Sequence, residues 1–372
     1  MIDMPKKKNL LLVICLLLLP VIIRAQKFTV SSPETVISDE RMKELGIREI
    51  DAGIFMMTER EGCKWFSTCP KTPQGQVIAV GPRDNPFEFL CESGKKIEGL
   101  PNYRPDRDWA GNFSWIANIY DMKFGNILAF IHTEERVNHR FETDKKGGVY
   151  FRFGLALSRD GGRNWNWLGY IMEPNVTFRE WYLNEGNLNI GYANYILKDD
   201  YFYVYYRDNR FENDAFIEGV AVMRAKIDEV VDAALSNRVT VWHKYCDGKW
   251  IEPGLGGRFT PLNIPVRGLM HGDAAYNEYL NKYILVVRGR KWENVKESEI
   301  NISFSEDGLK WSDWQIVHQD KHLNDYPSII SIGNNNEITG KEFYIHFLKH
   351  YDRDMPEKFG KVRSDRVMIT LE

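Results

Sequence analysis

Ser158-Arg159-Asp160-Gly161-Gly162-Arg163-Asn164-Trp165 has a near copy, one residue shorter, at Ser305-Glu306-Asp307-Gly308-Leu309-Lys310-Trp311. Both stretches follow the pattern Ser-x-Asp-(x)-Gly-x-x-Trp. The Asp side chain accepts hydrogen bonds from backbone N–H groups just after it, and Gly takes the positive φ that the turn requires. The Trp covers the turn from the next strand. The repeated turn predicts a sheet unit that is used more than once.

Four segments of the chain share a second design: a short apolar strand, a turn with Asn, Asp or Gly, and a longer aromatic strand. These pairs are Ser114–Asn118 with Ile127–His132, Ile190–Ile196 with Tyr201–Tyr206, Asp273–Tyr276 with Tyr283–Val287, and Ser328–Ile332 with Glu342–Phe347. A weaker copy, Ala52–Met57 with Gln76–Val80, comes first. Two further strands follow in the second and fourth units, Tyr150–Leu157 with Trp167–Ile171 and Ile300–Phe304 with Trp314–His318.

Four antiparallel strands repeated five times predict an all-β fold, a five-bladed β-propeller. A two-sheet sandwich is the alternative, but it does not predict the same turn at the same place in separate units. We expect a helical insertion at Ile227–Leu235 and a final strand at Arg366–Leu371 that completes a blade. An N-terminal stretch could close the ring.

The first 25 residues have the pattern of a secretory signal peptide. Lys6, Lys7 and Lys8 precede an apolar run from Leu10 to Ile23, and Ala25 follows it. A retained membrane anchor is the alternative, but the run is short for a span of about 20 residues. A lipoprotein site at Cys15 is disfavoured because the residue before it, Ile14, is large. We therefore expect a secreted or periplasmic protein, a single monomeric domain over residues 26–372, with no membrane span after cleavage.

The mature chain is mildly acidic. It carries 45 basic and 51 acidic residues, a net charge of −6. Binding to nucleic acid needs clustered Lys and Arg, so this charge argues against a nucleic-acid partner. The four remaining cysteines, Cys63, Cys69, Cys91 and Cys246, fit no zinc motif. We expect buried thiols or one disulfide among the first three, and neither a metal nor a cofactor.

Strand direction predicts where the chemistry lies. If the first strand of each blade starts at one end of the ring, the second strand finishes there, and the turn between the third and fourth strands lies at the other end. The two Ser–Asp–Gly–Trp turns are then structural. Ionisable residues at first-strand starts and second-strand ends should converge on one funnel mouth, although charged residues at strand ends can also simply meet solvent. These residues include Asp51, Arg83, His132, Glu134, Arg207, His271, Asp273, Arg288, Asp325 and Tyr326.

Several carboxylates around one funnel suit glycoside cleavage, in which an acid protonates the leaving oxygen and a second carboxylate activates water or attacks the sugar. We predict Asp51 as base or nucleophile, Asp273 as a tuning or second carboxylate, and Glu134 as the acid, with Glu185 as the alternative acid. The remaining predicted substrate-binding residues are His132 and His271, which could hydrogen-bond sugar hydroxyls or orient a carboxylate, and the aromatic residues Trp115, Tyr192 and Tyr326, which could stack on a sugar face.

Three arginines, Arg83, Arg207 and Arg288, fall at equivalent places in different blades. Guanidinium groups bind carboxylates in a fork, so converging arginines would recognise an acidic sugar. The alternative is that each pairs with a neighbouring acid, such as Asp84 or Asp208.

The two turns resemble the Asp boxes of the sialidase superfamily. The shorter form at Ser305–Trp311, the opening His271-Gly272-Asp273 and the stretch Tyr326-Pro327-Ser328 resemble five-bladed glycoside hydrolases of the arabinanase and furanosidase kind. The resemblance implies a propeller that cleaves an oligosaccharide or polysaccharide. The chain departs from both groups: it has no Arg-Ile-Pro motif near its start, no Tyr–Glu pair can be placed, and Glu134 comes earlier than the furanosidase order of acids. A non-catalytic glycan-binding propeller, a sialidase-like enzyme and a protein-interaction propeller with a flat apolar face therefore remain as alternatives.

Overall fold

A computed structural model describes most of the chain. The described residues are 26–44, 53–59, 62–68, 76–81, 90–93, 97–99, 109–137, 149–176, 194–212, 215–264, 271–290, 298–333, 336–350 and 362–372. The predicted signal peptide lies outside them, as do Asp51, Arg83, Glu185 and Tyr192, and the side chains of Cys63, Cys69 and Cys91 are not described either. Within the described part of the chain, no helix is long and apolar enough to cross a membrane.

The described strands form five hydrogen-bonded sheets. One contains β3 (Phe55–Glu59), β4 (Gly62–Thr68), β5 (Gln76–Gly81) and β6 (Leu90–Ser93). The next contains β8 (Trp109–Asp121), β9 (Ile127–Val137), β10 (Val149–Ser158) and β11 (Trp165–Met172), with β7 (Ile97–Glu98) parallel to β11. The third contains β12 (Asn194–Lys198), β13 (Tyr201–Glu212), β14 (Ala215–Lys226), β15 (His243–Cys246) and β16 (Lys249–Pro253).

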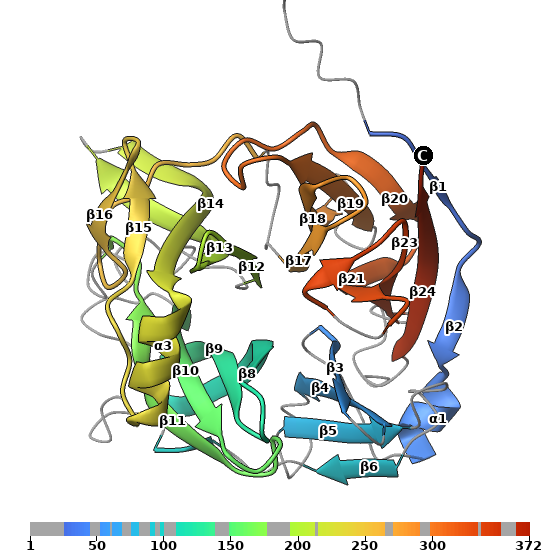
Figure 1. The fold of residues 1–372 in the computed structure, drawn as a ribbon, viewed down its shortest axis with the longest axis horizontal. Coiled ribbons are helices and arrows are strands. Elements are labelled where there is room, and N and C mark those ends of the chain that lie inside the picture. The colour runs from blue at the N-terminus through green and yellow to red at the C-terminus, as the bar shows by residue number, and fades with distance from the viewer. Residues whose placement is uncertain are drawn as a thin grey trace, which may run out of the picture.

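The last two sheets complete the circle. One contains β17 (Gly272–Asn277), β18 (Lys282–Arg290), β19 (Ser298–Ser305) and β20 (Gln315–Gln319), with β22 (Ile338–Thr339) parallel to β17. The other contains β21 (Leu323–Ser331), β23 (Glu342–His350), β24 (Val362–Leu371) and β1 (Phe28–Val30), with β2 (Glu34–Ile37) also paired to β24. The helices among the described residues are α1 (Asp39–Glu44) and α3 (Ile227–Leu235). The first strands β3, β8, β12, β17 and β21 lie nearest the centre (Figure 1).

This arrangement confirms the predicted all-β propeller, with 64% of the described residues in strands and 6% in helices. The described strands form five hydrogen-bonded sheets, but the structure counts as a propeller of four blades rather than the five predicted. The helix α3 spans the predicted residues Ile227–Leu235. The final strand completes a blade as expected, and the N-terminal stretch closes the ring because Phe28 pairs with Leu371.

One repeat differs from the prediction. Ala52–Met57 and Gln76–Val80 were expected to be the first and second strands of a blade, but β4 lies between β3 and β5 and pairs with both. The stretch Gly62–Thr68 lacks a clear alternation of apolar and polar residues, which is why its sequence does not mark it as a strand. Arg83 therefore follows a third strand rather than a second one. Strand direction no longer predicts that it lies at the funnel mouth.

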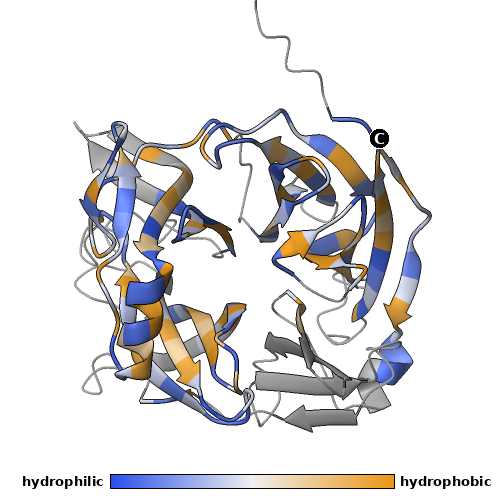
Figure 2. Cartoon of the chain, viewed as in Figure 1, coloured by the Kyte–Doolittle hydropathy of each residue, from blue (hydrophilic) through white to orange (hydrophobic). Residues whose placement is uncertain are grey.

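The core lies between neighbouring sheets. Along β18, Ile284 and Val286 pack in the cluster shared with the sheet of β21, whereas Leu285 and Val287 pack in the cluster shared with the sheet of β12. Successive side chains of a strand point to opposite faces, so both faces of β18 are buried. Figure 2 shows apolar residues along such strands. This packing holds adjacent sheets at a fixed angle and thereby fixes the positions of the strand ends.

Both Ser–Asp–Gly–Trp turns have the predicted internal hydrogen bonds. Asp160 Oδ1 accepts hydrogen bonds from the Ser158 hydroxyl at 2.9 Å and the Asn164 N–H at 2.8 Å, and Ser158 Oγ accepts one from the Gly162 N–H at 2.8 Å. Gly162 has a φ of 90°, a value that favours glycine. Asp307 caps the second turn in the same way, accepting backbone hydrogen bonds from Leu309 and Lys310 at 2.8 and 2.7 Å.

The first turn also shows at which end of the ring it lies. The Gly161 N–H donates to the Gly125 carbonyl oxygen at 2.9 Å, and Gly125 belongs to the turn between β8 and β9. The turn between the third and fourth strands is thus at the same end as the turn between the first and second. The ends of β9 and β18 and the starts of β17 and β21 lie at the opposite end, which we call the upper end.

Candidate functional site

A compact polar group lies at the upper end, where the sheet of β17 meets the sheet of β21. It contains His271, just before β17, Arg288, near the end of β18, and Asp325 and Tyr326, near the start of β21. His271 Nδ1 lies 2.7 Å from Asp325 Oδ1, and Arg288 Nη1 contacts Asp325 Oδ2. Residues from two sheets, all four expected at the funnel mouth, are therefore brought together.

Asp325 is the centre of this group. Its side chain is only 3% exposed, and that of Arg288 is 5% exposed. Its Oδ1 also accepts a hydrogen bond from the Tyr326 N–H at 2.8 Å. Burial alone would raise the pKa of Asp325, but the charges of Arg288 and His271 hold this pKa well below its usual range. Asp325 is therefore a fixed anion whose two oxygens are engaged by the protein.

The hydrogen bond to Asp325 determines how His271 is presented. In the neutral ring, Nδ1 carries the proton that is donated to Asp325, so Nε2 carries the lone pair. The backbone is fixed as well, because the Arg288 N–H donates to the His271 carbonyl oxygen at 2.9 Å. An imidazole oriented by a carboxylate in this way can accept or donate a proton at Nε2.

Glu134 and His132 form a second pair, within β9 (Ile127–Val137) rather than at its end as predicted. His132 Nε2 lies 3.7 Å from Glu134 Oε1, and both side chains are largely buried. The imidazole is surrounded by aromatic rings, with centroid distances of 5.7 Å to Trp115, 5.0 Å to Phe151 and 5.1 Å to Phe153. The predicted role of Glu134 as the acid stays a prediction.

Asp273 lies deeper, beside the central axis, and is 1% exposed. Its oxygens accept hydrogen bonds from the side chain of Asn118 at 3.3 Å and from the N–H groups of Ala274 and Ile329, both at 2.9 Å. Burial raises the pKa of Asp273 to about 7. These contacts join β8, β17 and β21, so the carboxyl is a structural link between inner strands, and a direct role in chemistry stays a prediction.

Further polar residues along the axis were not expected from the sequence. Asn336 Oδ1 accepts from the Met56 N–H at 2.6 Å, and its side-chain nitrogen donates to the Ile329 carbonyl oxygen at 3.0 Å. The Tyr195 hydroxyl donates to Glu337 Oε1 at 2.9 Å. The signal that could have revealed them is a polar residue within or next to an apolar inner strand.

Of the predicted arginine triad, the structure describes Arg207 and Arg288, while Arg83 lies outside the described residues. Arg288 has Asp325 as its partner, a residue from another sheet. Asp208, which was expected to neutralise Arg207, forms a fully buried ion pair with Lys244 at 2.7 Å. Arg207 is half-buried on β13. The charge of Arg288 is thus already balanced, which weakens the case for recognition of an acidic sugar.

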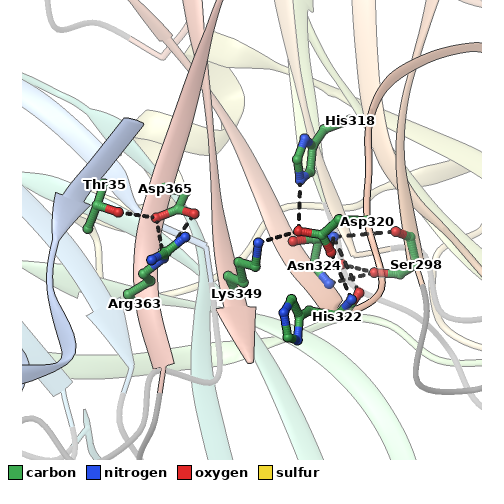
Figure 3. Close-up of polar contacts among 9 residues, drawn as sticks. All are labelled: Thr35, Ser298, His318, Asp320, His322, Asn324, Lys349, Arg363 and Asp365. Carbon is green, nitrogen blue, oxygen red and sulfur yellow. Dashed lines mark hydrogen bonds and ion pairs between the residues drawn. The ribbon is translucent and has the colours of Figure 1, made fainter. Parts of the chain in front are cut away.

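A second group built from the same residue types lies at the outer part of the junction between these sheets (Figure 3). Asp320 contacts the Lys349 ammonium and lies 3.5 Å from His318 Nε2. It also accepts from the Asn324 side chain at 3.0 Å and the His322 N–H at 2.8 Å. Although burial opposes it, the hydrogen bonds, led by that from Lys349, lower the pKa of Asp320 to about 2.

Among the residues that the structure describes, no group of three or more His, Cys, Asp or Glu side chains could hold a metal ion. Cys246 is a buried free thiol. The candidate residues thus fall into two groups: His271, Arg288, Asp325 and Tyr326 at the junction of the β17 and β21 sheets, and the His132–Glu134 pair on β9.

No family model and no curated protein matches the chain. Among solved structures, it is similar to the catalytic domain of a GH62 alpha-L-arabinofuranosidase from Coprinopsis cinerea (8% identity, TM-score 0.48, covering 93% of this chain and 97% of that one). It is also similar to a family 117 glycoside hydrolase from Zobellia galactanivorans (12% identity, TM-score 0.49, covering 93% and 90%). A third is the native Bacillus subtilis arabinanase (13% identity, TM-score 0.39, covering 87% and 94%). These neighbours are propeller glycoside hydrolases, but at such identities and TM-scores the likeness carries no argument about the reaction.

Proposed function

We propose that this chain is a glycoside hydrolase-like protein that acts on an oligosaccharide or polysaccharide at the upper end of the propeller. The observation that carries the proposal is the 2.7 Å contact between His271 Nδ1 and Asp325 Oδ1, with Arg288 on the other carboxylate oxygen. This arrangement presents an oriented imidazole where the inner strands begin. We further propose that the protein is secreted or periplasmic, monomeric and without a nucleic-acid partner.

In the proposed reaction, Glu134 protonates the leaving oxygen and Asp51 acts as base or nucleophile. Glu134 Oε1 lies 3.7 Å from His132 Nε2, which restrains the carboxyl on β9. His271 binds a sugar hydroxyl at Nε2 or exchanges a proton there. Asp273 supports the site from below by fixing the inner strands. The distance between the two reacting carboxyl groups would decide between retention, at about 5–5.5 Å, and inversion, at about 6.5–9.5 Å.

A second candidate is a glycan-binding propeller without turnover. It is favoured by one observation: both oxygens of Asp325 and of Asp273 are engaged by protein donors, which leaves fewer carboxylates to do chemistry. A sialidase-like enzyme is less well supported, because Arg288 is already paired with Asp325.

The test is a screen of the purified protein against chromogenic glycosides and natural polysaccharides, with release of sugar as the readout. Glu134→Gln and His271→Asn should each reduce turnover of any substrate found. His318→Asn is the matched control, since it removes an imidazole from the outer group only. Binding of a polysaccharide without release of sugar would favour the second candidate, and full activity in Glu134→Gln and His271→Asn would overturn the assigned site.

A further inference from the structure

Tyr326 has an unusual backbone. Its φ is 50°, in the left-handed region, which is disfavoured for a bulky side chain. The other described non-glycine residues with positive φ lie in tight turns or just after α3: Lys123, Phe124, Asp199, Asp200, Asn237, Asp247 and Asn281. Tyr326 alone among them lies inside a strand, β21, where extended backbone is the rule.

The strain coincides with a break in the sheet. The pairing of β21 with β23 shifts register between Asp325 and Ser328, which is the signature of a bulge. Pro327 follows directly and disfavours the right-handed helical region for Tyr326. Bulges of this kind re-aim a side chain beside functional sites.

The re-aimed side chain lies on His271. The two rings are stacked, with centroids 4.3 Å apart and planes at 14°. Asp325 meets the same imidazole at its edge, 2.7 Å from Nδ1. The Tyr326 N–H donates to that carboxylate oxygen at 2.8 Å, so one dipeptide fixes His271 both at the edge and on one face.

We propose that Tyr326 is a positioning residue whose strained backbone is retained because it places the phenol ring flat against His271 and fixes the plane of the imidazole. This inference deepens the proposed function and rests on it. It differs from the expectation that Tyr326 stacks on a sugar, since one face of the ring already covers His271. The positive φ explains this placement, because a residue with extended backbone at this position would direct its side chain away from His271.

Another ring stack at the same sheet junction supports this reading. His318 stacks on Phe347 with centroids 4.7 Å apart and planes at 23°. Phe347 lies within β23, and its φ is not among the positive values. An unstrained strand residue can therefore cover an imidazole across this junction, whereas the ring that covers His271 comes from a backbone with positive φ.

The experiment compares Tyr326→Phe, Tyr326→Leu and Tyr326→Gly in the full chain. The first readout needs no substrate: NMR of protein with ¹³C-labelled histidine, in which the His271 signal is assigned by its loss in His271→Asn. A stacked ring shifts the imidazole C–H protons upfield. We expect this shift to persist in Tyr326→Phe and to disappear in Tyr326→Leu and Tyr326→Gly.

The second readout is turnover of a substrate found in the screen. We expect kcat to stay within about threefold in Tyr326→Phe and to fall about 10–100-fold in Tyr326→Leu, with KM changed less than about threefold, in the range that misplacement of a catalytic group produces. Tyr326→Gly should lose activity like the Leu variant but resist denaturant better than it, because glycine adopts the left-handed backbone without strain.

Several outcomes would overturn the inference. An unchanged His271 signal in Tyr326→Leu would show that the ring does not set the imidazole environment, and equal loss in the Phe and Leu variants would assign the effect to the hydroxyl. If no substrate is ever turned over, the proposed function fails, but the NMR comparison still decides whether Tyr326 holds His271. If Tyr326→Leu does not fold, the Phe and Gly variants carry the same comparison.

Discussion

Two groups at the junction of the β17 and β21 sheets use the same three residue types, a histidine, an aspartate and a basic side chain. The inner group has His271, Asp325 and Arg288, and its His–Asp distance is 2.7 Å. The outer group has His318, Asp320 and Lys349, and its His–Asp distance is 3.5 Å. The inner aspartate is 3% exposed and the outer one 22%.

The difference shows what burial adds to a set of charges. The outer group contacts solvent and joins an outer strand, β20, to β23, so its ion pairs contribute modestly and can be replaced. In the inner group water cannot solvate the buried carboxylate. Its charge is therefore balanced only while Arg288 and His271 stay in one geometry. We infer that the outer group is structural, and we have proposed chemistry for the inner one.

The largest expected difference is in activity. His271→Asn keeps a donor for Asp325 but removes Nε2, and loss of a general acid or base typically costs about 10²–10⁴-fold in rate. The matched His318→Asn should stay within about twofold. Both variants are compared by their turnover rates on the substrate found in the screen. Near-ultraviolet circular dichroism checks that each variant is folded. Equal rates in the two variants would remove the distinction between the groups.

The next difference is in stability. Asp325→Asn leaves the Arg288 guanidinium buried without an anion, and breaking a buried pair in this way costs about 3–5 kcal/mol in the free energy of unfolding. Asp320→Asn should cost about 2.5 kcal/mol, from a pKa of about 2 in the folded protein against about 3.9 unfolded. Denaturant unfolding at pH 7 compares them. A larger loss in Asp320→Asn would reverse our assignment of the two groups.

The pH dependence of the outer group follows from the direction in which folding shifts the pKa of Asp320. The pKa of Asp320 is lowered by folding, so its contribution is present above pH 4 and is lost as the pH falls from about 4 to about 2. The stability difference between the wild type and Asp320→Asn should therefore shrink from about 2.5 kcal/mol at pH 6 to about 0.5 kcal/mol or less at pH 2. A difference that is constant over this range would mean that the Asp320 charge contributes nothing.

The smallest expected effect is that of Lys349→Met. Asp320 keeps its hydrogen bonds from Asn324 and the His322 N–H, and it remains partly solvated. We expect a loss of about 1 kcal/mol or less, as for other partly exposed pairs. Denaturant midpoints of this variant and the wild type provide the measurement. A loss as large as that of Asp325→Asn would show that the outer group is no weaker than the inner one.

Much of the fold could be predicted from sequence because its signals are local. Alternating strands, the two Ser–Asp–Gly–Trp turns and the amphipathic stretch Ile227–Leu235 each depend on neighbours a few residues away. The strand β4 was missed because apolar and polar residues do not alternate in its sequence. The same local rules placed His271, Asp325 and Tyr326 at strand starts.

The pairing within the site could not be predicted. His271 and Asp325 are 54 residues apart and meet only because two sheets pack and β21 bulges. Several acidic residues were predicted at the same end of the ring as Arg288, and the sequence does not indicate that Asp325 is its partner. The burial of Asp273 depends on a register that points its carboxyl at the backbone of β21, which no residue pattern in β17 reveals.

The pairing of β1 with β24 has a consequence for biosynthesis. Thr29 pairs with Thr370, so the first strand of the ring needs a partner that is translated more than three hundred residues later. At about 5–20 residues per second, the nascent chain carries an unpaired edge for tens of seconds. Such an edge invites association with other chains. This protein should therefore depend on a chaperone or a holding factor during synthesis more than a propeller whose blades each close locally.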